Sequence, residues 1–82
     1  MDSFGEIIEI GRRTKGITAT RAANLIGVTK QTLWKWEKNK NFPKGEHLLS
    51  LCKVLEIEAT DLVRSKMKME KEAKKTGLGV TQ

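Results

Sequence analysis

The apolar residues of this 82-residue chain recur with a helical spacing in five separate stretches, each bounded by residues that start or end helices. The first predicted helix follows Ser3, which forms a capping box with Glu6, and it ends at Gly16. Its apolar face is made by Phe4, Ile7, Ile8 and, less regularly, Ile10. Gly11 interrupts that face, so either the helix frays there or another side chain packs closely against the glycine.

Two short helices joined by a tight turn are predicted between Thr18 and Lys38. Thr18 caps the first helix, and Gly27 ends it because glycine adopts a left-handed conformation without a Cβ penalty. Thr29 caps the second helix. The inward positions are Ala22, Ala23 and Ile26 on the first helix and Leu33 and Trp36 on the second. The other face of the second helix carries long hydrogen-bond donors around one aromatic ring: Lys30, Gln31, Trp34, Lys35 and Lys38.

Two further helices are predicted after a turn-prone cluster at 39–41 and a Phe42-Pro43 loop that packs on the core. One covers about residues 45–55, and the other starts near residue 58 or 59 with Leu62 and Val63 inward. The apolar positions of the former are Leu48, Leu51, Cys52 and Leu55. The last helix extends, fraying, to about residue 75, and residues 77–82 show no periodicity and are expected to be disordered.

The charge of the chain points to a polyanionic partner. The formal net charge is +6, and it is uneven: residues 1–63 hold ten Lys or Arg and eight Asp or Glu, whereas residues 64–82 hold six and two. Nucleic acid is the commonest ligand of such a basic protein, although the charge by itself could serve solubility alone.

Several classes of function find no support in the sequence. Cys52 is the only cysteine and falls at a core position, and His47 is the only histidine, so we expect no metal site, no catalytic residues and no cofactor. No apolar run is long enough to span a membrane, and the acidic N-terminus does not resemble a signal peptide. We therefore expect a cytoplasmic, non-enzymatic protein with no small-molecule ligand.

A set of residues between about 4 and 63 follows a recognisable arrangement: Gly16-Ile17-Thr18, Ala23, Gly27-Val28-Thr29, Leu33, Trp36-Glu37, Pro43 and the closing segment HLLSLCKVLEIEATDLV. This arrangement resembles the Cro/repressor, or XRE, family of helix-turn-helix DNA-binding proteins of phages and bacteria. The resemblance implies an all-α, five-helix, lambda-repressor-like domain over residues 1–63, followed by a basic tail over 64–82. It also implies an ion pair between Arg12 and Glu37 that orients the recognition helix.

The resemblance assigns roles to the polar residues of the two-helix unit. Side chains near the start of the recognition helix meet base edges in the major groove, and here these are Lys30, Gln31 and Lys35. Trp34 is unusual for the family, and it could contact a thymine methyl group or sugar edges, cover a protein neighbour, or be buried in the core. The candidate phosphate contacts are Thr18, Ala19, Lys38, Lys40, Asn41 and Lys44. Ala19 departs from the family, which often has Gln there, and keeps only a backbone N–H for this role.

The function that follows is a sequence-specific transcriptional regulator, Cro-like or a small repressor, that binds a palindromic operator in double-stranded DNA as a homodimer. The dimer contact is expected from the apolar residues of the closing segment: Ile57, Leu62, Val63 and Met67. One alternative is a winged, DNA-bending factor similar to excisionase and AlpA, which requires a strand pair after the recognition helix. Another is an antitoxin-like protein-interaction module.

Overall fold

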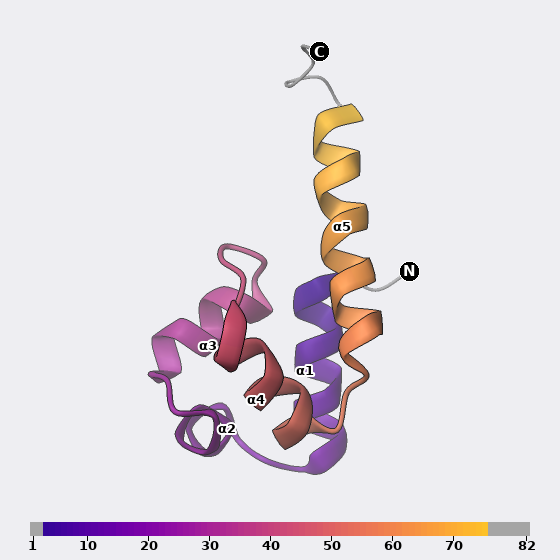
Figure 1. The fold of residues 1–82 in the computed structure, drawn as a ribbon. Helices are drawn as coiled ribbons and strands as arrows, with labels where there is room; N and C mark the ends of the chain where they lie inside the picture. The colour runs from indigo at the N-terminus through magenta and orange to yellow at the C-terminus, as the bar shows by residue number, and fades with distance from the viewer. Residues whose placement is uncertain (1–2, 76–82) are drawn as a thin grey trace.

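The computed structural model describes residues 3–75, which form five helices and, within this range, no strand (Figure 1). The helices are α1 (Phe4–Lys15), α2 (Ala19–Ile26), α3 (Lys30–Glu37), α4 (Gly45–Leu55) and α5 (Ala59–Lys75). The predicted all-α, five-helix, lambda-repressor-like fold is confirmed. The winged alternative lacks its strand pair, because the chain between α3 and α4 forms turns, bends and irregular backbone but no strand. The predicted disordered end, residues 77–82, lies outside the described residues.

The helix ends are set by local side chains, as the sequence predicted. In the capping box of α1, the backbone N–H of Glu6 donates to Ser3 Oγ at 3.2 Å, and the Ser3 N–H donates to Glu6 Oε1 at 2.8 Å. Thr18 and Thr29 accept in the same way from the backbone N–H groups of Arg21 and Thr32, both at 3.1 Å. Gly16 and Gly27 end α1 and α2 with φ of 73° and 93°. These starts and ends are therefore confirmed.

The core takes at least one residue from every helix: Phe4, Ile8, Ala22, Ala23, Ile26, Leu33, Trp36, Leu51, Cys52, Leu55 and Leu62. Burial, with a smaller contribution from nearby Glu58, raises the pKa of the Cys52 thiol. Phe42 packs edge-on against Phe4, with ring centroids 5.0 Å apart, so the predicted docking of this loop is confirmed. The prediction that Val63 points inward is wrong, since its side chain is 41% exposed while neighbouring Leu62 fills the core.

Gly11 interrupts the apolar face of α1 because another side chain packs closely against it, and not because the helix frays. α1 continues through Gly11, and a Cβ atom placed there would lie 2.8 Å from Cδ1 of Ile57. Ile57, in the connection between α4 and α5, therefore occupies the space that a larger residue would need.

The extension of the last helix belongs partly to the packed fold. α5 reaches Lys75, as predicted, and Met69 packs against the core with its sulfur accepting from the Phe4 N–H at 3.4 Å. Lys66 lies over the Phe42 ring at 5.3 Å. The part of α5 that follows residue 63 therefore contacts the start of α1 and the loop after α3.

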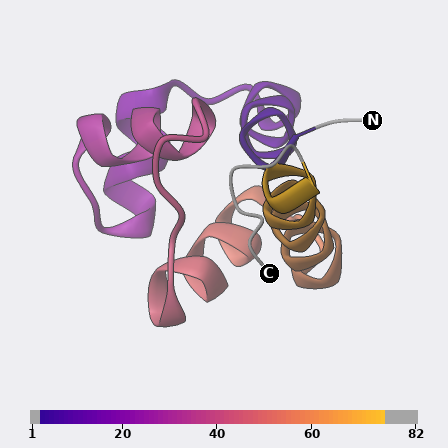
Figure 2. The same cartoon turned by 90° about the horizontal axis from the view of Figure 1, so that it is seen from above.

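The helices are arranged so that the α2–α3 pair and α5 lie on opposite sides of the molecule. α1 and α4 lie between them, with α1 beside α5 (Figure 2). α5 runs past the rest of the fold (Figure 1), and the described chain measures 41 × 21 × 20 Å. A surface on α5 and a surface on α3 can therefore be occupied at the same time.

Candidate nucleic-acid interface

α2 and α3 form a helix-turn-helix whose turn is closed by backbone hydrogen bonds. The N–H groups of Gly27 and Val28 both donate to the carbonyl oxygen of Ala23, at 2.8 and 3.0 Å. The inner face of α3 is anchored by Leu33 and Trp36, which are 0% and 3% exposed. Trp36 is thus a core residue, as its spacing from Leu33 predicted. The turn and this anchored face fix α3 relative to α2.

The outer face of α3 consists of exposed side chains: Lys30, Gln31, Trp34 and Lys35. Trp34 is 48% exposed, so core burial of this ring is excluded. Lys30, Gln31 and Trp34 line an open hollow of about 240 Å³, which we name the α3 hollow. Three of the four predicted base-contact residues therefore lie together, with Lys35 exposed beside them.

The predicted phosphate-contact residues lie on either side of this unit. In the loop after α3, Lys38, Lys40, Asn41 and Lys44 are all exposed. Lys40 lies next to the outer face of α3, with Nζ 5.9 Å from the centroid of the Trp34 ring. Asn41 Oδ1 accepts from the Phe42 N–H at 3.2 Å, and Lys44 is the N-terminal cap residue of α4.

Thr18 and Ala19 differ in what they offer at the start of α2. Thr18 is exposed, and its hydroxyl oxygen caps the helix by accepting from the Arg21 N–H. Ala19 is half-buried, and its side chain packs against the core. The side chain of Ala19 therefore serves the fold, and of these two residues only Thr18 has a side-chain hydroxyl.

The predicted ion pair between α1 and α3 is confirmed. Arg12 Nε donates to Glu37 Oε2 at 2.8 Å, and Arg12 Nη2 donates to Glu37 Oε1 at 3.3 Å, in a bidentate arrangement. Arg12 Nη1 also donates to the carbonyl oxygen of Ile17, at 3.2 Å. The bond to Glu37 raises the pKa of Arg12. With side chains only 13% and 8% exposed, the pair joins α1, the entry to α2 and the end of α3.

A second link, between the start of α1 and the loop directly after α3, was not predicted from the sequence. Asn39 adopts a left-handed conformation with φ of 60°; its Oδ1 accepts from the Gly5 N–H at 2.8 Å, and its Nδ2 donates to Ser3 Oγ at 3.1 Å. Gly5 approaches the end of α3 so closely that a Cβ atom would lie 2.1 Å from the carbonyl oxygen of Glu37. A glycine in a first helical turn and an asparagine in a polar loop give no signal of this pairing by themselves.

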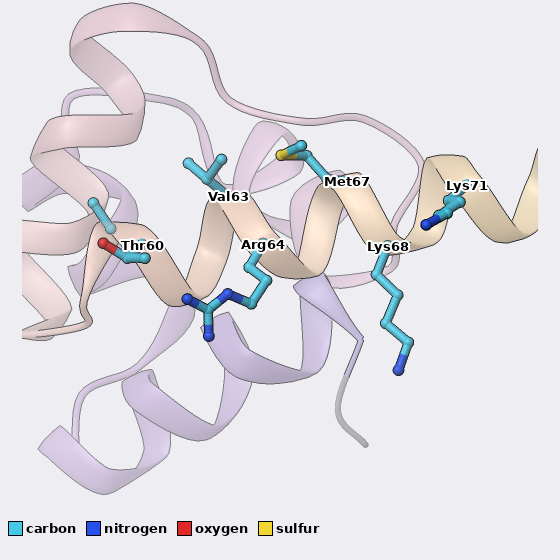
Figure 3. A pocket seen from close by; sticks show the side chains of 7 residues that line it. Thr60, Val63, Arg64, Met67, Lys68 and Lys71 are labelled. Carbon is cyan, nitrogen blue, oxygen red and sulfur yellow. The ribbon is translucent and has the colours of Figure 1, made fainter.

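The predicted dimer residues are only partly on the surface. Leu62 is 0% exposed and fills the core, whereas Ile57 is half-buried with its side chain close to Gly11. Val63 and Met67 are 41% and 61% exposed, one helical turn apart, and they point to the same side of α5 (Figure 3). We name these two residues the α5 face. They line a hollow of about 730 Å³ together with Ala59, Thr60, Arg64, Lys68 and Lys71.

Other candidate chemistry is limited. His47 is exposed, with its ring centroid 6.1 Å from that of Trp36. Within residues 3–75, no group of three or more His, Cys, Asp or Glu side chains is placed to hold a metal ion. In the same part of the chain, no helix is long and apolar enough to cross a membrane.

The sequence matches the helix-turn-helix family over residues 8–62, most of the chain. The chain belongs to this family, the XRE type of helix-turn-helix DNA-binding protein. No match is found among curated protein sequences.

Solved structures of a repressor and of a gene regulator have the same fold. The P22 c2 repressor in complex with synthetic operator 9T has a TM-score of 0.74 and 28% identity, over 79% of this chain and 98% of that one. The solution structure of the P22 c2 repressor DNA-binding domain has a TM-score of 0.71 and 29% identity, over 76% and 82% of the two chains. The clp gene regulator ClgR from Corynebacterium glutamicum shares the fold at 23% identity, with a TM-score of 0.68 over 89% and 79%.

Proposed function

We propose that this DNA-binding transcriptional regulator is a sequence-specific, Cro-like or small repressor that binds a palindromic operator as a homodimer in the cytoplasm. The observation that carries the proposal is the outer face of α3, whose long donors and single aromatic ring are exposed while the inner face is locked into the core. The similarity to the operator-bound P22 c2 repressor supports the same use of α3. Residues 1–63 would form the DNA-binding domain and residues 64–82 a basic tail.

The side chains of the outer face suit base edges in the major groove. The ammonium groups of Lys30 and Lys35 can donate to guanine O6 and N7, and the amide of Gln31 can pair with adenine N6 and N7. Trp34 adds an apolar contact between them. In this proposal these four residues discriminate between base pairs, and the two links between α1 and α3 hold them in position.

The residues around α3 would contact the DNA backbone. Lys38, Lys40, Asn41 and Lys44 follow α3, and Thr18 and the backbone of Ala19 start α2. In this proposal, these groups bind the phosphates that flank the groove that α3 enters. Contacts of this kind are independent of sequence and weaken with salt, with a slope near −0.9 per neutralised phosphate.

The dimer is proposed to form through the α5 face. One recognition helix contacts only a few base pairs, too few to select one site among the ~10⁶ or more competing sites of a genome. Two copies on a palindrome double the contacts, with half-sites about 34–36 Å apart, one helical turn. Because α5 lies on the other side of the molecule from α2 and α3 (Figure 2), contact through Val63 and Met67 would leave both recognition helices free.

Selection of binding sites from a random pool of duplex DNA tests the reading of bases. We expect a palindromic consensus, and we expect Lys30→Ala, Gln31→Ala and Lys35→Ala each to weaken binding to it by ~1–3 kcal/mol and to relax preference at particular positions. Lys53→Ala, which removes an exposed cation from α4, is the matched control and should keep the preference. A loss that is equal on all DNA sequences would assign the α3 residues to phosphate contact and contradict base reading.

Sedimentation with and without the selected duplex tests the dimer. Val63→Glu with Met67→Glu should abolish cooperative binding of two copies while leaving the far-UV circular dichroism unchanged, because both side chains are exposed. Leu49→Glu, at another exposed apolar position on α4, is the control and should bind as the wild type does. Wild-type protein that occupies its site as one copy, or a double variant that still binds cooperatively, would refute the dimer. A different protein that is captured through this face would favour the interaction-module alternative.

A further inference from the structure

Trp34 places a large apolar ring where the fold does not need one. Its neighbour on the inner face, Trp36, is 3% exposed and fills the core, whereas Trp34 is 48% exposed on a surface made otherwise of polar side chains. Lys40 lies over the ring, with Nζ 5.9 Å from its centroid, so a residue of the loop after α3 contacts one side of it. The ring therefore has this neighbour while half of its surface stays exposed.

The α3 hollow combines this ring with two polar side chains. Lys30 and Gln31 form the rest of its lining, and its surface is mainly apolar despite these two residues. The hollow lies in the first turns of α3, the part of a recognition helix that enters the major groove. An occupant of the hollow therefore meets an apolar wall beside two hydrogen-bonding groups.

Among the groups that base pairs display in the major groove, one is apolar: the 5-methyl group of thymine. Its neighbour on the same edge is a hydrogen-bond acceptor, thymine O4, and the paired adenine shows a donor and an acceptor. An aromatic wall next to a lysine and a glutamine matches this combination. Sugar and phosphate groups are present at every base pair, so contact with them would make Trp34 indifferent to sequence.

We propose that the α3 hollow receives the 5-methyl group of a thymine in each operator half-site, which makes Trp34 a specificity-determining residue. The inference rests on the proposed function, since it requires α3 to lie in the major groove. Burial of one methyl group contributes about a four-fold change in affinity per half-site, so about sixteen-fold for a dimer on both half-sites.

Deoxyuridine substitution isolates this contact, because uracil differs from thymine only by the methyl group. The full chain is titrated with the selected duplex and with duplexes in which each thymine in turn is replaced by deoxyuridine in both half-sites. Wild-type protein should lose about sixteen-fold in affinity at one symmetric position and little elsewhere. Trp34→Ala should bind the thymine and deoxyuridine duplexes equally at that position. Leu49→Ala, at an exposed apolar position outside α3, is the control and should keep the thymine preference.

The outcomes separate this inference from the proposed function. If wild-type protein selects a consensus but binds every deoxyuridine duplex as tightly as the thymine duplex, the methyl contact is refuted and base reading stands. If Trp34→Ala keeps the thymine preference, another residue reads the methyl group and the inference is wrong. An equal loss by Trp34→Ala on all duplexes assigns the ring to sugar contact and also refutes it. Failure of wild-type protein to select any sequence would refute the proposed function itself.

Discussion

The two faces of α3 differ in their exposure to solvent, although both belong to one helix of eight residues. The inner face, with Leu33, Trp36 and Glu37, is buried and tied to α1 and α2. The outer face, with Lys30, Gln31, Trp34 and Lys35, is exposed and makes few contacts with the rest of the fold. Stability is therefore concentrated on one side of the helix, and recognition is proposed for the other.

This division means that the outer residues can be exchanged without loss of the fold. Substitutions at exposed positions usually change the free energy of unfolding by less than about 0.5 kcal/mol. The same substitutions on the inner face would open cavities or leave buried charges unpaired. Substitutions on the inner face should therefore lower the free energy of unfolding. Substitutions on the outer face should weaken DNA binding and leave the free energy of unfolding nearly unchanged.

The sharpest test compares the two tryptophans. Trp36→Ala should lower the free energy of unfolding by about 3–5 kcal/mol, because it removes a large side chain that is 3% exposed. Trp34→Ala should change it by less than about 0.5 kcal/mol, because its side chain is half exposed. Urea unfolding followed by far-UV circular dichroism measures both. Equal effects of the two substitutions would contradict the division of α3 into a structural and a recognition face.

The next effect concerns the ion pair that ties α3 to α1. Glu37→Gln should cost about 2–3 kcal/mol of stability, because Arg12 is left largely buried without its counter-charge. DNA affinity should fall as well, because α3 loses an anchor. Glu9→Gln is the control: its pair with Arg13 has a side chain that is 70% exposed, and its loss should cost at most about 1 kcal/mol. A similar cost for both substitutions would show that burial does not strengthen the Arg12–Glu37 pair.

A smaller loss of stability is expected from substitution of Gly5, which lies against the end of α3. Gly5→Ala should destabilise the protein by about 1–3 kcal/mol, because the new Cβ atom would meet the rigid backbone of Glu37. Gly11→Ala should cost less, because it meets the end of the Ile57 side chain, which can move, and alanine favours the helix by up to ~1 kcal/mol. Thermal unfolding of both variants checks the order, and a reversed order would contradict the close approach at Gly5.

The smallest effect lies outside α3, at the exposed start of α1. The Ser3 backbone N–H, followed by the Ser3 hydroxyl, lowers the pKa of Glu6 below its ordinary value of 4.5. A carboxylate with a lowered pKa stabilises the folded state above the unfolded pKa, and this contribution is lost as pH falls through the folded pKa. Glu6→Gln should therefore flatten the fall in melting temperature between neutral pH and about pH 3. An unchanged acid profile would show that the capping carboxylate contributes nothing measurable.

The local features of this protein could be predicted from its sequence because neighbouring residues create them. Ser3, Thr18 and Thr29 each accept from a backbone N–H three residues ahead, so their capping depends on no distant contact. The core spacing of Leu33 and Trp36 follows from the helical period in the same way. The fold class and the place of the candidate interface on α3 were predicted from these features and from the resemblance to repressors.

Tertiary structure decided the features that depend on residues far apart in the chain. Leu62 and Val63 are adjacent apolar residues, and only the position of α5 against the core determines that the first is buried and the second exposed. The link between Gly5 and Asn39 exists only because the chain packs the end of α3 and the residues after it against the start of α1. The glycine at position 11 is likewise required by a residue far along the chain, because the side chain of Ile57 packs where a Cβ atom would lie. The physical reason is that capping and periodicity act within a few residues, whereas packing depends on which surfaces the folded chain brings together.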